Sequence, residues 1–452
     1  MRKYIITLFV FLISALKMNA LIPENTFQVN GFDDLAFRIV EAVDGHNIRG
    51  VEVFASSEVS GNFEIPRQIE FNGEALEVVG IGEQGFQNSA ITSINLPSSI
   101  TYLGRYSLDG SKISEINLPE NLLCIEEYAL AWLSVTEIVL PNSVKELGDC
   151  VFDGCENLKN ITLSHSLKEI PLGCFWRCSS LETIYIPNNV EYWENNATEK
   201  CYNLKTIIFE DGSTPLTIGQ RMRSTLYSAF SKDVTAEVYF GRPITNYFSS
   251  GLGSKISKIT CGPYFSEIPD NFAKYCVGLQ SFTSEYEISK IGNYSFSGCS
   301  QLETFQIHNP TFSTIGSFCF FGCSQLNNFE IPFSVTIIES GAFNGCSSLR
   351  SIVALPTTPP SFEPENTNSE FEGVDKEICI LEVPESSFSL YANAEVWKDF
   401  LKIQTSGISE RKIDNSMNDR TYYDLYGREV QNPQNGLYIQ RKGKITSKVF
   451  IP

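Results

Sequence analysis

Short apolar runs recur along most of the chain at a nearly constant spacing. The recurring pattern is Leu/Ile-x-x-Ile-x-Leu-Pro, as in Ile91 to Pro97. It predicts a short strand whose first, fourth and sixth side chains point inward. The sixth place of the pattern is occupied in successive copies by Leu96, Leu118, Leu140, Leu163, Ile186 and Phe209. Each of these residues lies 22 or 23 residues after the one before it. The pattern resumes from residue 256 to residue 354 with steps of 23 or 24 residues, so the chain is a repeat array.

A second pattern lies between these strands and has the form Val-x-x-Ile-Gly-x-x-Ala-Phe-x-Gly-Cys. The stretch from Ser289 to Cys299 is a good copy. One column of this pattern is aromatic or aliphatic, at Phe86, Leu108, Leu130, Phe152, Phe175, Phe296, Phe320 and Phe343. A unit of this length cannot bury its own apolar side, whereas stacked units bury each other's. The pattern therefore predicts a solenoid whose parallel strands lie about 4.8 Å apart.

These motifs resemble the BspA-like type of leucine-rich repeat, which occurs in bacterial and protist surface proteins. The stretch from Ala342 to Leu349, followed by Ile352, carries the resemblance most clearly, and it extends over about residues 40–405. It implies a leucine-rich repeat solenoid with repeats of about 22–24 residues. In such a fold the strands form a curved parallel sheet, and turns with short 3-10 or α segments form the other face.

Composition changes along the chain predict further boundaries. We expect an N-terminal β cap at 21–80, the solenoid at 81–358, a C-terminal cap at 359–405 and a polar linker at 406–419. Asn72-Gly73 between apolar runs predicts a hairpin within the first cap. Residues 420–452 resemble the small C-terminal β module of exported Bacteroidetes proteins, which is related to sorting domains. Whether this module is a working sorting signal stays open.

The first twenty residues have the pattern of a secretory signal. Arg2 and Lys3 precede the apolar run from Tyr4 to Leu16, and Ala20 ends the segment on a small residue. A buried N-terminal helix is the alternative. Nothing later in the chain is apolar enough to span a bilayer. We therefore predict an exported protein, extracellular or on the outer cell surface, without a transmembrane segment.

One interruption breaks the repeat. Phe209 and Phe240 occupy equivalent strand positions but lie 31 residues apart, and the extra length falls in Gly212 to Asp233. Insertions in solenoids form loops on one face, which is often a binding face. A neutral surface loop is the alternative interpretation.

The charge of the chain and the motifs it contains limit the classes of function that it can have. Apolar residues make up 42% and charged residues 19% of the chain, which excludes a disordered protein. The net charge of −19 disfavours nucleic acid as a partner. Motifs of metalloproteases, serine hydrolases and phosphate-binding loops are missing, so we predict a protein that is not an enzyme and has no cofactor or metal. A glycosidase built from two scattered carboxylates is the one enzyme class that this search leaves open.

The thirteen cysteines follow the repeat rather than a disulfide framework. Those at one repeat position are Cys155, Cys178, Cys201, Cys276, Cys299, Cys323 and Cys346. Equivalent side chains on stacked coils point the same way, which disfavours the geometry of a disulfide. The pattern predicts a column of small, buried and mostly reduced thiols.

The solvent-facing strand positions supply the candidate site. The second, third and fifth positions are expected on the concave side, and the fifth is apolar or aromatic in the middle of the array. We call Val139, Tyr185, Ile208 and Tyr239 the fifth-position patch. β-Propensity alone is the alternative reason for these residues. The resemblance implies an adhesin that binds host extracellular-matrix proteins or the surface proteins of host or bacterial cells. A carbohydrate-binding or nutrient-capture protein and a structural component without a ligand are the alternatives.

Overall fold

A computed structural model describes most of the repeat array and parts of the C-terminal region. The described residues are 23, 25–41, 49–55, 58–219, 230, 235–246, 252–362, 370–406, 420–423, 429–430, 436–442 and 445–451. The chain divides into two compact units, Met1–Thr405 and Ser406–Pro452, which are treated separately below. The signal-like segment 1–20 and nearly all of the expected linker lie outside the described residues.

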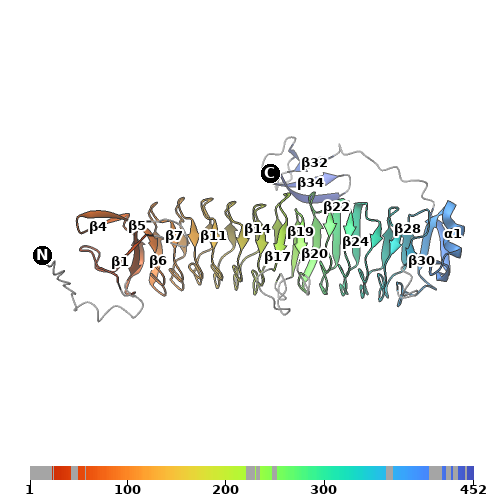
Figure 1. Ribbon diagram of the computed structural model, residues 1–452, viewed down its shortest axis with the longest axis horizontal. Coiled ribbons are helices and arrows are strands. Elements are labelled where there is room, and N and C mark those ends of the chain that lie inside the picture. The colour runs from red at the N-terminus through yellow and green to blue at the C-terminus, as the bar shows by residue number, and fades with distance from the viewer. Residues whose placement is uncertain are drawn as a thin grey trace, which may run out of the picture. The chain divides into compact units, whose positions relative to one another are not determined.

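The first unit is a stack of coils, and each coil contributes one strand to a row that we call the strand face (Figure 1). Neighbouring strands of successive coils pair in parallel, for example β14 with β16 and β26 with β28. The row consists of β3 (Ser60–Glu64), β6 (Ala90–Asn95), β8 (Glu115–Ile116), β10 (Glu137–Val139), β12 (Asn160–Thr162), β14 (Thr183–Ile186), β16 (Thr206–Phe209), β18 (Ala236–Phe240), β20 (Ile256–Cys261), β22 (Ser281–Ile288), β24 (Thr304–Pro310), β26 (Asn328–Ile331), β28 (Ser351–Ala354), β30 (Ile380–Pro384) and β31 (Lys402–Ser406).

A second row of mostly two- or three-residue strands forms another side of the coils. Its members are β5 (Glu74–Ile81), β7 (Tyr102–Leu103), β9 (Cys124–Ile125), β11 (Glu146–Leu147), β13 (Glu169–Ile170), β15 (Tyr192–Trp193), β17 (Leu216–Ile218), β19 (Ile244–Asn246), β21 (Glu267–Ile268), β23 (Lys290–Ile291), β25 (Thr314–Ile315), β27 (Ile337–Ile338) and β29 (Ser361–Phe362). The predicted solenoid of stacked parallel strands is therefore confirmed.

The side of the coils between the second row and the next strand of the first row is made of turns, and we call it the turn face. The short 3-10 or α segments expected there are absent from the described coils, so that part of the fold prediction is wrong. The reason is local: residues with positive φ recur four apart in these turns, as at Tyr128 (55°) and Trp132 (56°). Left-handed residues at this spacing end any helical turn before it can propagate.

Different elements close the two ends of the first unit. At the N-terminal end β1 (Leu35–Val40) pairs antiparallel with β2 (Gly50–Ala55), and β4 (Gln68–Phe71) pairs antiparallel with β5. Asn72 and Gly73 join β4 to β5 with φ of 53° and 77°, which confirms the predicted hairpin. At the C-terminal end η1 (Glu385–Ser387), α1 (Phe388–Asn393) and η2 (Trp397–Asp399) follow β30, and the side chain of Trp397 is fully buried.

The second unit contains a small antiparallel sheet in the order β33-β32-β34-β35. Its strands are β32 (Arg420–Tyr423), β33 (Glu429–Val430), β34 (Gly436–Lys442) and β35 (Ile445–Ile451). None of the helices in the described residues is both long and apolar enough to cross a membrane.

The core of the first unit combines the inward strand positions with the aromatic column. Within one coil Leu181, Ile184 and Ile186 at positions one, four and six are all fully buried, as predicted. In the C-terminal coils the rings of Phe296 and Phe320 stack at a centroid distance of 5.6 Å. Stacked pairs of this kind contribute about 0.5–1.5 kcal/mol beyond their burial. The column therefore joins each coil to the next.

Candidate functional site

Three of the four residues of the fifth-position patch form one row across the strand face. Tyr185 on β14 pairs with Ile208 on β16, and Ile208 pairs with Tyr239 on β18. Val139 on β10 pairs instead with Thr162 on β12, in a separate two-stranded sheet. The structure thus brings Tyr185, Ile208 and Tyr239 together and leaves Val139 two strands away from them.

The members of the patch differ in their exposure. Val139 is 54% exposed, whereas Tyr185, Ile208 and Tyr239 are half-buried. Burial, reinforced by the charge of Asp211, raises the pKa of Tyr239. Burial, reinforced by the charge of Glu210, likewise raises the pKa of Tyr185. Both phenols therefore keep their protons at physiological pH.

A polar network that the sequence did not reveal lies where these strands end. Glu210 and Asp211 directly follow β16; Glu210 is buried and Asp211 is half-buried. The Tyr239 hydroxyl donates to Asp211 Oδ1 at 2.7 Å, and the backbone N–H of Asn188 donates to Glu210 Oε2 at 2.8 Å. The only available signal was the two acids at the place where other coils have Pro, as in Ile186-Pro187.

Glycines make room for this network. A Cβ at Gly241 would lie 2.4 Å from Asp211 Oδ1, and one at Gly262 would lie 2.3 Å from the Tyr239 hydroxyl oxygen. Such distances are far shorter than any van der Waals contact. The absence of both side chains therefore permits Asp211 to reach Tyr239 across the intervening turn.

Arg242 closes the network from the next coil. Its side chain is fully buried, and Nη1 donates to the carbonyl oxygens of Asn188 at 2.8 Å and Val190 at 2.6 Å. Burial lowers the pKa of Arg242 to about 10, although the charge of Glu210 opposes the change. The guanidinium remains charged at neutral pH and joins coils on both sides of the interruption.

The predicted insertion Gly212–Asp233 falls only partly within the described residues. Leu216 to Ile218 form strand β17, which pairs with β15 and β19 in the second row. Part of the extra length therefore belongs to a regular coil of the solenoid. Residues 220–229 and 231–234 lie outside the described residues, so its role in binding stays a prediction.

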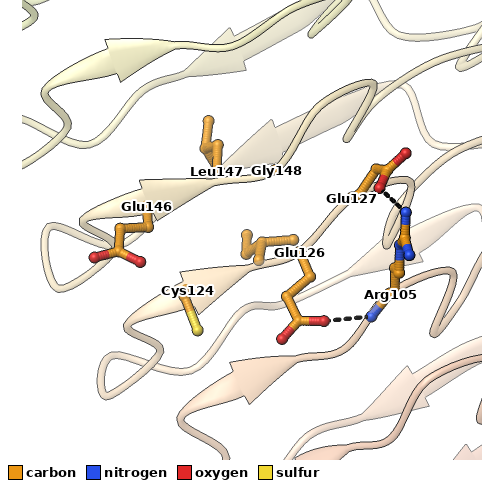
Figure 2. A pocket seen from close by; sticks show the side chains of 8 residues that line it. Arg105, Cys124, Glu126, Glu127, Glu146, Leu147 and Gly148 are labelled. Carbon is orange, nitrogen blue, oxygen red and sulfur yellow. Dashed lines mark hydrogen bonds and ion pairs between the residues drawn. The ribbon is translucent and has the colours of Figure 1, made fainter. Parts of the chain in front are cut away.

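A pocket lies in the second row, away from the fifth-position patch. It has a volume of about 290 Å³ and is lined by Arg105, Cys124, Ile125, Glu126, Glu127, Glu146, Leu147 and Gly148 (Figure 2). The backbone N–H of Arg105 donates to Glu126 Oε2 at 2.8 Å, and its guanidinium forms an ion pair with Glu127. These contacts link neighbouring coils. Across the described residues, no three His, Cys, Asp or Glu side chains are placed to hold a metal ion.

All thirteen cysteines are buried, as predicted for those at the common repeat position. Several thiols at the common repeat position bond to the backbone of the neighbouring coil: Cys178 Sγ donates to the Phe152 carbonyl oxygen at 3.2 Å, and Cys346 Sγ donates to that of Phe320 at the same distance. Burial raises the pKa of Cys155 to about 12. The column thus acts as packing and as a weak hydrogen-bond ladder.

Stacked coils of this kind define a leucine-rich repeat solenoid. The family described as BspA type leucine rich repeat region matches in six copies, over residues 50–134, 79–205, 124–229 and 246–363. These ranges span more than half of the chain, and the chain belongs to this family. No protein with a curated description matches it.

Several solved structures are similar over most of their length. A leucine-rich repeat protein from Bacteroides ovatus ATCC 8483 is 20% identical with a TM-score of 0.45, covering 84% of this chain and 99% of that one. A leucine rich cell surface protein from Faecalibacterium prausnitzii A2-165 is 18% identical with a TM-score of 0.35, covering 87% and 97%. The pneumococcal vaccine antigen PcpA is 20% identical with a TM-score of 0.37, covering 85% and 99%. At such identities the likeness concerns the fold alone.

Proposed function

We propose that this chain is a cell-surface protein that binds a protein partner through its strand face, with the fifth-position patch at the centre of the contact. The observation that carries the proposal is the row Tyr185, Ile208 and Tyr239 on three adjacent strands. Tyrosine is enriched among the residues that dominate binding energy at protein interfaces. A sheet presents these side chains with little loss of conformational freedom on binding.

The surroundings of the row support this role. The Tyr239 ring is held by its hydrogen bond to Asp211, so it is oriented before any partner arrives. Beyond Tyr239 the same column continues with Thr260 and Thr283, whose hydroxyl oxygens lie 3.4 Å apart. An apolar and aromatic centre beside polar neighbours is the usual composition of a protein interface.

Family membership supports the proposed location at the cell surface. Membership of the BspA-type repeat family agrees with export directed by residues 1–20 and with adhesion to host extracellular-matrix or cell-surface proteins. The sorting role of residues 420–452 is part of this proposal. We also propose that the chain is not an enzyme. A carbohydrate-binding or nutrient-capture role and a purely structural role are the competing functions.

The test is binding of the purified full chain to fibronectin, laminin and collagen and to a glycan array. Two variants place a charge in the patch, Val139→Lys and Ile208→Lys. The matched control is Gln306→Lys, which adds the same charge at an exposed fifth position on β24. We expect saturable binding to one matrix protein, weakened at least tenfold by Ile208→Lys and unchanged in the control. Circular dichroism verifies that each variant is folded.

Other outcomes separate the alternatives. Binding that survives both patch variants would place the contact elsewhere on the repeat surface and contradict the role of the patch. Binding to glycans alone would favour the carbohydrate-binding function. Absence of binding to every component would contradict adhesion and leave the structural role.

A further inference from the structure

The turn face of the C-terminal coils carries exposed aromatic side chains. They are Tyr275, Tyr294, Phe318 and Phe321, and together with Lys274 we call them the ring cluster. Tyr275 is 57% exposed and Phe321 is 42% exposed, while Phe318 is half-buried. Single exposed apolar residues are ordinary on any protein, whereas a contiguous patch of them marks an interaction site.

Direct contacts join the ring cluster into one patch. The rings of Tyr294 and Phe318 stack at a centroid distance of 5.1 Å, and Phe318 meets Phe321 edge-on at 5.8 Å. Lys274 Nζ lies 5.3 Å from the centroid of the Tyr275 ring and 4.8 Å from that of Tyr294. The patch is therefore continuous over three successive coils.

The ring cluster offers the edges of its rings rather than their faces. Tyr294 lies between Phe318 on one side and the ammonium group of Lys274 on the other. A Cβ at Gly298 would lie 2.7 Å from Tyr275 Cδ1, so the Tyr275 ring lies against the next coil. Ring edges carry positive partial charge and attract carbonyl and carboxylate oxygens. A sugar that stacks on an open ring face fits this arrangement less well than a protein segment does.

The turns around the ring cluster are almost free of charge. Lys274 is the only charged residue in four successive turns, which are residues 271–278, 294–301, 318–325 and 341–348. The same turns of earlier coils contain Asp109, Asp153 and Arg177. Among the described residues, no carboxylate lies within ion-pair distance of Lys274. The ring cluster thus holds a single cation without a counter-charge.

We propose that the ring cluster is a second docking site, which binds an extended protein segment that has one carboxylate among apolar and uncharged residues. The carboxylate pairs with Lys274 Nζ, and the apolar side chains pack against the exposed edges of Tyr275 and Phe321. Gly298 and Gly322 continue the column of Tyr275 without a side chain, so the backbone of the segment can approach these turns closely.

Charge selects this kind of segment. A basic segment would meet the ammonium group of Lys274, and like charges at a contact suppress the wrong partner. A strongly acidic segment would meet the net charge of −19 that the whole chain carries. A single carboxylate avoids both costs, because salt screens the remaining acids beyond about 8 Å at physiological ionic strength. The pair with Lys274 then forms beside aromatic rings, where less water competes for it.

The test is selection of random dodecapeptides displayed on phage against the immobilised full chain. Phage are first depleted on the double variant Lys274→Gln/Phe321→Ser, which removes peptides that bind to any other surface of the chain. We expect the remaining pool to be enriched in peptides that have Asp or Glu beside Leu, Ile, Phe or Tyr. Arg and Lys should be depleted in the same peptides.

Single variants then measure the contribution of each group, by fluorescence anisotropy with a synthetic copy of the most enriched peptide. Lys274→Gln and Phe321→Ser should each weaken binding at least tenfold. The fold should tolerate Phe321→Ser, because Ser297 holds the same position in the preceding coil. The matched controls are Lys145→Gln and Tyr264→Ser, at exposed positions outside the ring cluster, and both should bind as the parent does. Circular dichroism verifies that every variant is folded.

Four results would overturn the proposal. They are no enrichment after depletion, enriched peptides without an acidic residue, parental affinity in the folded Lys274→Gln variant, and glycan-array binding that Phe321→Ser abolishes. The last result would assign the ring cluster to a carbohydrate. The ring cluster and the fifth-position patch lie on different faces of the coils, so Ile208→Lys should leave peptide binding unchanged. Failure of one site is therefore distinguishable from failure of the other.

Discussion

The hydroxyl group of Tyr239 donates a 2.7 Å hydrogen bond to Oδ1 of Asp211, which lies one coil earlier at the start of the interruption in the repeat. The contact orients a central ring of the strand face and at the same time lowers the exposure of a carboxylate. One interaction thus connects the shape of the candidate binding surface with the charge state of a single acid.

Asp211 should make stability depend on pH. Burial raises its pKa above the ordinary value of 3.8, although the hydrogen bond from Tyr239 opposes the change. The folded state then binds the proton more tightly than the unfolded chain. The stabilising contribution is complete below the unfolded pKa and is lost as the pH rises through the folded one.

Asp211→Asn keeps an oxygen that accepts the Tyr239 hydrogen bond and removes the buried charge. We therefore expect the variant to be more stable than the parent at pH 7 and to approach it as the pH falls to 4. Urea denaturation at several pH values measures the difference. Asp34→Asn, at an exposed position, is the control and should change little at any pH. A variant that is less stable at pH 7 would show that the carboxylate supports the network.

Two glycines should respond differently to alanine because their constraints differ. A Cβ at Gly148 would lie 2.1 Å from the backbone nitrogen of Glu127, so Gly148→Ala forces two coils apart. At Gly322 the added Cβ meets only the Cα atom of Gly298, at an ordinary contact distance of 3.9 Å, but φ is 72°. We expect a loss of about 3 kcal/mol or more for Gly148→Ala. Gly322→Ala should lose about 1–2 kcal/mol.

Thermal and urea unfolding of both variants measure these losses. Equal losses would mean that the coils shift easily around Gly148, and that the close approach seen at this point is not a constraint on the fold.

The aromatic column should carry much of the coupling between coils. Phe320 stacks on Phe296 at 5.6 Å and on Phe343 at 5.4 Å, and it contacts the ring of Phe305 edge-on at 4.9 Å. Phe320→Ala should cost about 3–5 kcal/mol through lost contacts and an internal cavity. Phe320→Leu should cost less, about 1–2 kcal/mol, because leucine fills the same column at Leu130.

The comparison of unfolding midpoints decides whether the column needs aromatic rings or only apolar volume. A leucine variant as unstable as the alanine variant would show that ring stacking, rather than buried volume, dominates the energy.

The regular parts of this fold could be predicted from the sequence because they repeat. Leu181, Ile184 and Ile186 were assigned to the core from their spacing alone, and the coils place them there. The buried cysteine column, which includes Cys323, was predicted from the same repeat spacing. Periodicity constrains every coil at once, so an error at one position is corrected by the others.

The features that the sequence did not predict occur in single coils and do not repeat along the chain. No periodic signal connects Asp211 with Tyr239, because the irregular step between their coils hides which turn lies beside which strand. The place of Trp132 was also missed, because its indole is held by Arg177 from two coils further along. The expected helical segments failed for a similar reason, because left-handed turns are determined by local contacts that strand spacing does not report.

The cysteines give a final prediction about reactivity. Every thiol is buried, and burial raises the pKa of Cys155 to about 12 and that of Cys379 to about 11. Because the thiolate is the reactive form, both access and ionisation oppose modification in the folded state. We expect Ellman's reagent at pH 8 to label fewer than one thiol per folded chain, and all thirteen after unfolding in guanidinium chloride with no reductant present.

The rate of labelling should then follow the rate of local or global opening, and it should increase with urea in parallel with unfolding. Cys150 is 5% exposed and is the expected site of the first label, so Cys150→Ala should slow the earliest phase and leave the rest unchanged. Recovery of clearly fewer than thirteen thiols from the unreduced, unfolded chain would contradict this assignment. It would show that some members of the column are joined as disulfides in the exported protein.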